Sequence, residues 1–153
     1  MKDKDILEAL RVRAAQILIA NGYHTDAGAR VLQGKVFDTQ TDTLPAIVIT
    51  QPEDDADYVD DDETSTEPQM VSTFVLEGWR EVDQANPLPD LMDLREDLLR
   101  ACYRPTPDLP DTLGGTVSAM RLDSTTKLMP APGASIGMAQ VVLRVEYHET
   151  FGD

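Results

Sequence analysis

The chain has little of several features that would narrow its function quickly. Cys102 is the only cysteine in 153 residues, so neither an intrachain disulfide nor a cluster of thiolate metal ligands can form. Aromatic residues make up 5% of the chain, so aliphatic side chains must fill most of a core. No apolar run approaches the roughly 20 residues that cross a bilayer, and the charged N-terminal stretch does not fit a signal peptide. We therefore expect a protein that folds in water and has no membrane partner.

Basic residues are also scarce, and the excess of acid is concentrated in one place. The chain has 13 Lys and Arg against 28 Asp and Glu, a net charge of −15. Nine of the acidic residues lie in residues 52–68, which hold no Lys or Arg. Because the acidity is local, a generally disordered acidic chain is not expected. Specific binding to a nucleic-acid backbone is not expected either, since that affinity comes from Lys and Arg.

The hydrophobic pattern predicts two helices and five strands in one domain over residues 1–153. A stripe of apolar residues predicts a helix over residues 4–20 that ends at Asn21-Gly22, and Asn86-Pro87 opens a second helix over 88–102. The strand-like runs span residues 30–37, 46–51, 69–79, 115–123 and 138–148. We expect an α/β (α+β) fold, with both helices on one face of a mixed or antiparallel sheet. The second face also carries apolar side chains that no helix is left to cover.

The residue types that carry most enzyme chemistry are few and badly placed. His24 and His148 have no cysteine near them in sequence, and no GxSxG motif is present. Cys102 falls on the apolar face of a predicted helix, which indicates a core residue. Gly114-Gly115 is not followed by the Lys-Ser/Thr of a phosphate-binding loop. We therefore expect no enzymatic activity, no catalytic residues and no cofactor.

The acidic segment at 52–68 joins two predicted strands, so it is an oversized loop inside the domain. Loops of this length in compact domains are usually functional or disordered. No register supplies the glycine of an EF-hand, although a looser Ca²⁺ site from Asp60, Asp61 and Asp62 stays open, as in a small acidic interaction module. A solvated outer loop and a charged wall that faces a partner are the other interpretations.

The ordered set of segments resembles the tail-terminator proteins of long-tailed bacteriophages, the minor tail protein U-like family. The likeness covers nearly the whole chain and lies in hydrophobic patterns more than in chemistry. Its segments are the N-terminal helix ILEALRVRAAQILI, the strand LPAIVI, an acidic loop, a strand that ends EGW, the helix LPDLMDLREDLLRAC, a GGTV strand and the last stretch AQVVLRVEYHETFGD. Head–tail connector and tail-completion proteins share similar features.

The resemblance implies a structural virion protein that forms a hexameric ring on the head-proximal end of the tail tube. Such a ring stops tube polymerisation and offers a surface for head attachment. Its partners would be further copies of this chain, the tail tube protein and a head-completion or neck protein. It would be assembled in the host cytoplasm, and the genome would pass through it without specific binding.

Two segments are the candidate sites for this role. Carboxylates repel phosphates, so the acidic loop suits the wall or rim of a DNA channel. Its candidate residues are Asp54, Asp55, Asp57, Asp60, Asp61, Asp62 and Glu63. The second segment is the hairpin at 128–134, where apolar residues beside two prolines would be unusual in a free loop. A hairpin that folds back on its own sheet is the alternative. Its candidate interface residues are Leu128, Met129, Pro130 and Pro132.

Overall fold

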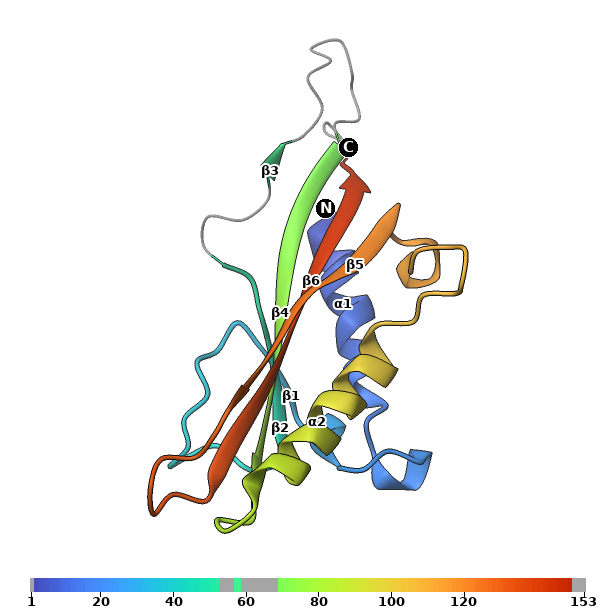
Figure 1. Cartoon of the computed structure of the whole chain (residues 1–153). Helices are drawn as coiled ribbons and strands as arrows, with labels where there is room; N and C mark the ends of the chain where they lie inside the picture. The colour runs from blue at the N-terminus through green and yellow to red at the C-terminus, as the bar shows by residue number, and fades with distance from the viewer. Residues whose placement is uncertain (1, 53–56, 59–68, 150–153) are drawn as a thin grey trace.

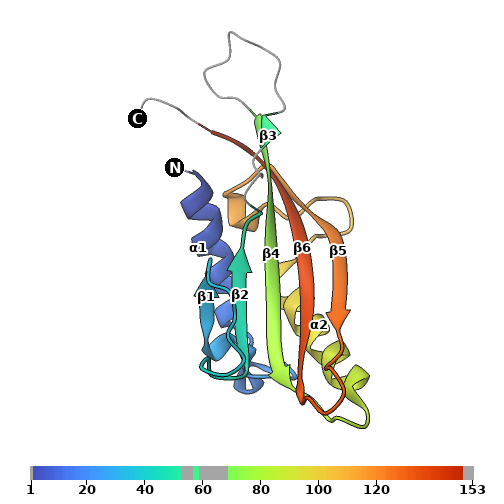
Figure 2. The same cartoon turned by 90° about the vertical axis from the view of Figure 1, so that its left-hand side faces the viewer.

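Two α-helices lie against one face of a mixed β-sheet (Figure 1 and Figure 2). The computed structural model describes residues 2–52, 57–58 and 69–149. The helices are α1 (Lys2–Ala15) and α2 (Pro87–Cys102), and the strands are β1 (Val31–Gln33), β2 (Ala46–Thr50), β3 (Asp57–Tyr58), β4 (Gln69–Glu81), β5 (Ala119–Leu128) and β6 (Ile136–His148). The predicted α+β class and the placement of both helices on one face are confirmed.

The sheet is built around one long antiparallel pair. Its order is β1-β2-β4-β6-β5, with the two-residue β3 also paired to β4. Among the described strands, only β1 and β2 run parallel. β4 and β6 pair along their whole length, from Gln69 opposite His148 to Glu81 opposite Ile136. This pair gives the sheet two distinct ends: the start of β4 at Gln69 lies at the first, and the hairpin between β5 and β6 lies at the second (Figure 1).

The core lies between the helices and the sheet. Alternate residues of β4 and β6, including Phe74, Leu76 and Leu143, point toward the helices and are buried. They meet Leu10 of α1 and the buried leucines of α2. Gly78 lets α2 lie close to β4, because a Cβ at this position would come within 2.9 Å of the Leu94 side chain. The aliphatic core that the low aromatic content predicts is therefore present.

The first helix is shorter than its apolar stripe predicts. α1 ends at Ala15, and residues 16–22 form turns that end at Gly22 with φ +89°. Ile17 is nevertheless fully buried, because the chain folds back onto the end of α1. Gly28 donates its N–H to the Ile17 carbonyl at 2.8 Å, and a Cβ at Gly28 would lie 2.4 Å from the Ala14 carbonyl oxygen. The burial of the stripe was predicted correctly, and its helical backbone was predicted correctly only as far as Ala15.

The strand predicted over 30–37 is also shorter. β1 ends at Gln33, and Gly34 turns the chain with φ +72°. Phe37 then packs over the second face of the sheet, where its ring stacks on Trp79 with centroids 4.9 Å apart. Val48 and Ala46 complete this small second cluster. The segment 34–45 therefore covers part of the face that was expected to be bare.

Two buried carboxylates tie loops to the helices. Asp97 of α2 accepts hydrogen bonds from the N–H groups of His24 and Thr25, at 3.0 and 2.8 Å, and from the Thr25 hydroxyl. Asp111 forms a bidentate pair with Arg13 of α1, at 2.5 and 3.0 Å, and accepts the N–H of Arg104. Burial acts to raise the pKa of Asp111, but the Arg13 guanidinium and the backbone donors outweigh it and hold the pKa below the usual range.

Candidate functional site

The hairpin between β5 and β6 presents apolar side chains to solvent. Leu128 is 53% exposed and Met129 is 43% exposed. Pro130 is partly exposed, and Pro132 lies at the exposed tip beside Gly133, whose φ of +82° fits the turn. The hairpin extends beyond the end of the sheet (Figure 1). It does not fold back onto the sheet to bury these residues, so they are available to a partner.

The strand that leads into this hairpin is an edge of the sheet. Within the described residues, β5 pairs along its length only with β6. Its beginning is covered, since Met120 donates its N–H to the Asp111 carbonyl at 2.7 Å. Beyond this point the strand is mostly exposed up to Leu128, with a bulge near Asp123. An open edge is a template for strand pairing, and bulges and charged residues such as Lys127 limit uncontrolled pairing.

A cleft opens at the same end of the sheet as the hairpin. Its volume is about 570 Å³. Its walls include Leu44, Pro45 and Ile136 as well as the charged Arg80 and Glu81. One end of the molecule thus carries both a projecting apolar hairpin and a recess in which Leu44, Pro45 and Ile136 lie among polar and charged residues.

The second face of the sheet differs in part from its expected character. No helix covers it in the part of the chain that the structure describes, as predicted. Its large aromatic side chain, Trp79, is however covered by the stacked ring of Phe37. Elsewhere polar and charged residues are interspersed; Arg121 and Arg144, for example, lie directly opposite each other. This face is therefore a weaker docking candidate than the hairpin and the β5 edge.

The acidic candidates fall mainly outside the described residues. This applies to Asp54, Asp55, Asp60, Asp61, Asp62 and Glu63. The backbone of Asp57 is described: it lies in β3, where Asp57 pairs with Val71 and Tyr58 with Met70. The segment leaves the sheet after β2 and returns at Gln69, the end opposite the hairpin. Since β4 has 13 residues, Gln69 lies about 40 Å from the hairpin end of the strand.

The remaining residues considered for chemistry lie in separate places. Cys102 is fully buried, and burial raises the pKa of its thiol to about 12, so it stays protonated at neutral pH. His148 is exposed near the end of β6. His24 lies close to two carboxylates of α2, Asp93 and Glu96, an arrangement that the sequence analysis did not predict. The only sequence signal was the spacing of the two acids, three residues apart on one helix.

Comparison with known proteins adds no assignment. A scan against protein-family models finds no match, and a search of curated proteins finds none either. In the described residues, no helix has the length and apolar character needed to span a membrane.

Proposed function

We propose that this protein is a structural component of a long-tailed phage or prophage virion that caps the head-proximal end of the tail tube as a ring. In this role it stops tube polymerisation and offers a surface for head attachment. The observation that carries the proposal is the exposed apolar hairpin at 128–132 beside the open part of β5. The sequence resemblance supports the role, and a head–tail connector in the same neck region is the alternative.

A ring requires two different surfaces on each subunit that fit each other. Head-to-tail contacts of this kind close into a ring when the rotation between subunits divides the circle. The apolar hairpin supplies a projecting surface, while the cleft with Leu44, Pro45 and Ile136 supplies a recess at the same end of the sheet. The uncovered part of β5 adds backbone groups for pairing. These features support lateral association between copies.

The opposite ends of the subunit also suit a cap. The hairpin end exposes Leu128 and Met129, whereas the chain that follows the acidic segment 52–68 enters the sheet at Gln69, at the other end. A cap has one neighbour on the tube side and another on the head side, and different chemistry at each end suits two different neighbours. A ring rim that bears carboxylates would not retain the passing genome.

The first test is to remove the apolar character of the hairpin. Replacement of Leu128 and Met129 with Ser should leave the fold intact, because both side chains are already about half exposed. The variant should lose ring formation, or capping where wild-type rings form only on tubes. Mass measurement in solution and tube lengths in negative-stain images check this result. The control is Leu109→Ser, which removes an even more exposed leucine (67%) elsewhere. Assembly that persists in the double variant would exclude the hairpin as the interface.

The second test concerns the acidic segment. Replacement of Asp60, Asp61 and Asp62 with Lys should give rings that retain DNA, with an affinity that falls as salt rises, and should slow genome passage. The matched triple Asn variant removes the same charges without adding positive ones and should not retain DNA. Substitutions are preferred to deletion of residues 54–66, because that deletion would also remove β3. Lys-variant rings that release DNA as the wild type does would refute the channel-wall role.

A Ca²⁺ titration separates the remaining alternative for this segment. If Asp60, Asp61 and Asp62 bind Ca²⁺ in the folded state, millimolar Ca²⁺ will raise the melting temperature of the wild type but not of the Asn variant. A channel-wall role predicts no such difference between the two proteins.

A further inference from the structure

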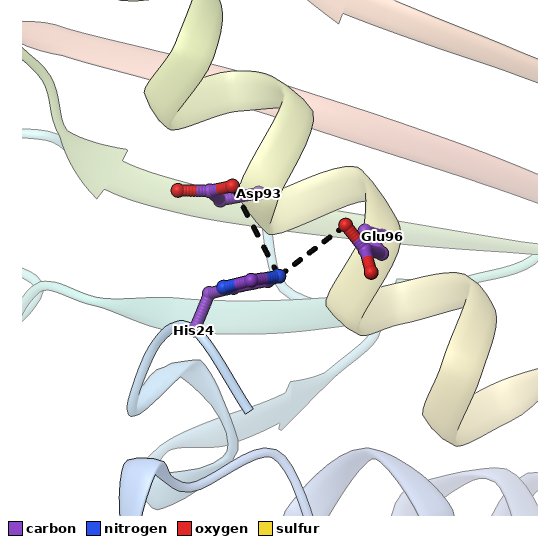
Figure 3. A group of neighbouring side chains, drawn as sticks. All are labelled: His24, Asp93 and Glu96. Carbon is purple, nitrogen blue, oxygen red and sulfur yellow. Dashed lines mark hydrogen bonds and ion pairs between the residues drawn. The ribbon is translucent and has the colours of Figure 1, made fainter. Parts of the chain in front are cut away.

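Three potential metal ligands from two distant segments converge on the surface of the helix layer. His24 lies in the turn before β1, and its Nε2 is 3.3 Å from Glu96 Oε2 and 4.0 Å from Asp93 Oδ1. Figure 3 shows the imidazole pointing between the two carboxylates of α2. One ligand atom from each residue can be chosen so that all three lie within 4.8 Å of one another.

The fold positions these ligands before any ion binds. Asp93 and Glu96 are three residues apart on α2, so both project from one side of a regular helix. The backbone of His24 is fixed to the same helix, because its N–H donates to the buried carboxylate of Asp97 at 3.0 Å. The N–H of Thr25 bonds to the other oxygen of Asp97 at 2.8 Å. The turn that carries the imidazole is therefore tied to the helix that carries the two acids.

The spacing fits the coordination sphere of a small transition-metal ion. Nitrogen and oxygen ligands lie about 2.0–2.2 Å from a tetrahedral zinc ion, which places neighbouring ligand atoms about 3.3–3.6 Å apart. The His24–Glu96 pair is already at 3.3 Å. Asp93 must move closer to both other ligands, since its oxygen is 4.0 Å from His24 Nε2 and the three ligand atoms lie within 4.8 Å of one another. Its side chain is 46% exposed and so has room to rotate. An imidazole combined with carboxylates favours Zn²⁺ and similar ions over Ca²⁺, which prefers oxygen ligands alone.

We propose that His24, Asp93 and Glu96 form a surface site for a divalent transition-metal ion of the Zn²⁺ class, with water in the remaining positions. Bound metal would join the turn before β1 to α2 beside the Asp97 hydrogen bonds. Its positive charge would also offset the repulsion between the two carboxylates. Because the ion binds the folded arrangement, it stabilises the fold by linkage. The proposal does not rest on the proposed ring, although His24 also lines the cleft that holds Leu44, Pro45 and Ile136.

The test is calorimetric titration of the full chain with Zn²⁺, together with thermal unfolding. Wild-type protein should bind one Zn²⁺ per chain at this site, and saturating Zn²⁺ should raise its melting temperature by several degrees. His24→Ala and Glu96→Gln should each weaken binding about tenfold or more and abolish the thermal shift. In EDTA these two variants should melt at the wild-type temperature, because the replaced side chains are about half exposed.

Two controls separate this site from other metal binding. His148→Ala removes the only other histidine and should leave Zn²⁺ binding unchanged. The Asn variant of Asp60, Asp61 and Asp62 tests the acidic segment, and Zn²⁺ binding should persist in it. Wild-type affinity in His24→Ala, loss of binding in the Asn variant, or no stoichiometric binding to the wild type would overturn the proposal. The last result would leave His24 and the two acids as a surface ion pair.

Discussion

Leu98→Asp should leave the protein unfolded at room temperature. Leu98 is fully buried in the middle of the core face of α2. An unpaired carboxylate in this position costs several kcal/mol, against a total stability of about 5–15 kcal/mol for a typical domain. Leu10→Asp in α1 should have the same effect, because Leu10 is also fully buried. Loss of the far-UV circular dichroism signal and of a cooperative urea transition is the measurement.

Met92→Asp is the matched control, since it places the same charge on the same helix. Met92 is 44% exposed, so its carboxylate stays in water and the urea midpoint should change little. If Leu98→Asp unfolded at the urea concentration of Met92→Asp, then the face of α2 that carries Leu98 would not be the core face.

The parts of the fold that the sequence predicts well are those where local signals and tertiary packing agree. α2 begins at Pro87, as the Asn86-Pro87 pair indicates, and its leucines face the core. β6 alternates buried and more exposed residues as its sequence does, from Leu143 to His148. In both elements the apolar residues recur along the sequence with the same period as the helix or strand that they form. The sequence alone therefore gave their type, and it gave their bounds to within two residues.

The errors occur where the backbone departs from the pattern that its side chains follow. Ile17 continues the apolar stripe of α1 and is buried, but by a turn that packs Gly28 against the helix end. Phe37 continues the apolar run of β1, but Gly34 has already turned the chain onto the second face of the sheet. A hydrophobic pattern indicates which side chains are buried, but more than one backbone path can bury the same side chains.

The two candidate sites also differ in this respect: one can be predicted from adjacent residues, and the other depends on residues far apart in the sequence. Leu128 and Met129 beside prolines in a turn are a local signal, and their exposure follows from the hairpin. The approach of His24 to Glu96 is not local, because the two residues are 72 positions apart. It depends on where the chain passes after α1, and the sequence pattern did not predict that path.

Asp97→Ala should be among the most damaging polar substitutions in the protein. Asp97 is fully buried and accepts the N–H groups of His24 and Thr25 as well as the Thr25 hydroxyl. Each buried N–H left without an acceptor costs about 1–3 kcal/mol. The variant should therefore lose roughly 3 kcal/mol or more of its free energy of unfolding, measured by urea titration in EDTA. EDTA keeps metal binding at His24 out of the comparison.

Asp97→Asn keeps the size and shape of this side chain but changes its charge and its hydrogen-bond acceptors. An amide has the size of the carboxylate but only one oxygen, and the two backbone N–H groups bond to different oxygens of Asp97, so one of them loses its acceptor. Its NH₂ group would face one of these donors, and the Asn variant should also be destabilised, though less than Ala because no cavity forms. Asp93→Ala is the control on the exposed side of α2 and should change stability by about 0.5 kcal/mol or less. If the Asn variant were as stable as the wild type, the hydrogen bonds to the 24–25 turn would not contribute to folding, and the fixed position of His24 would lose its physical basis.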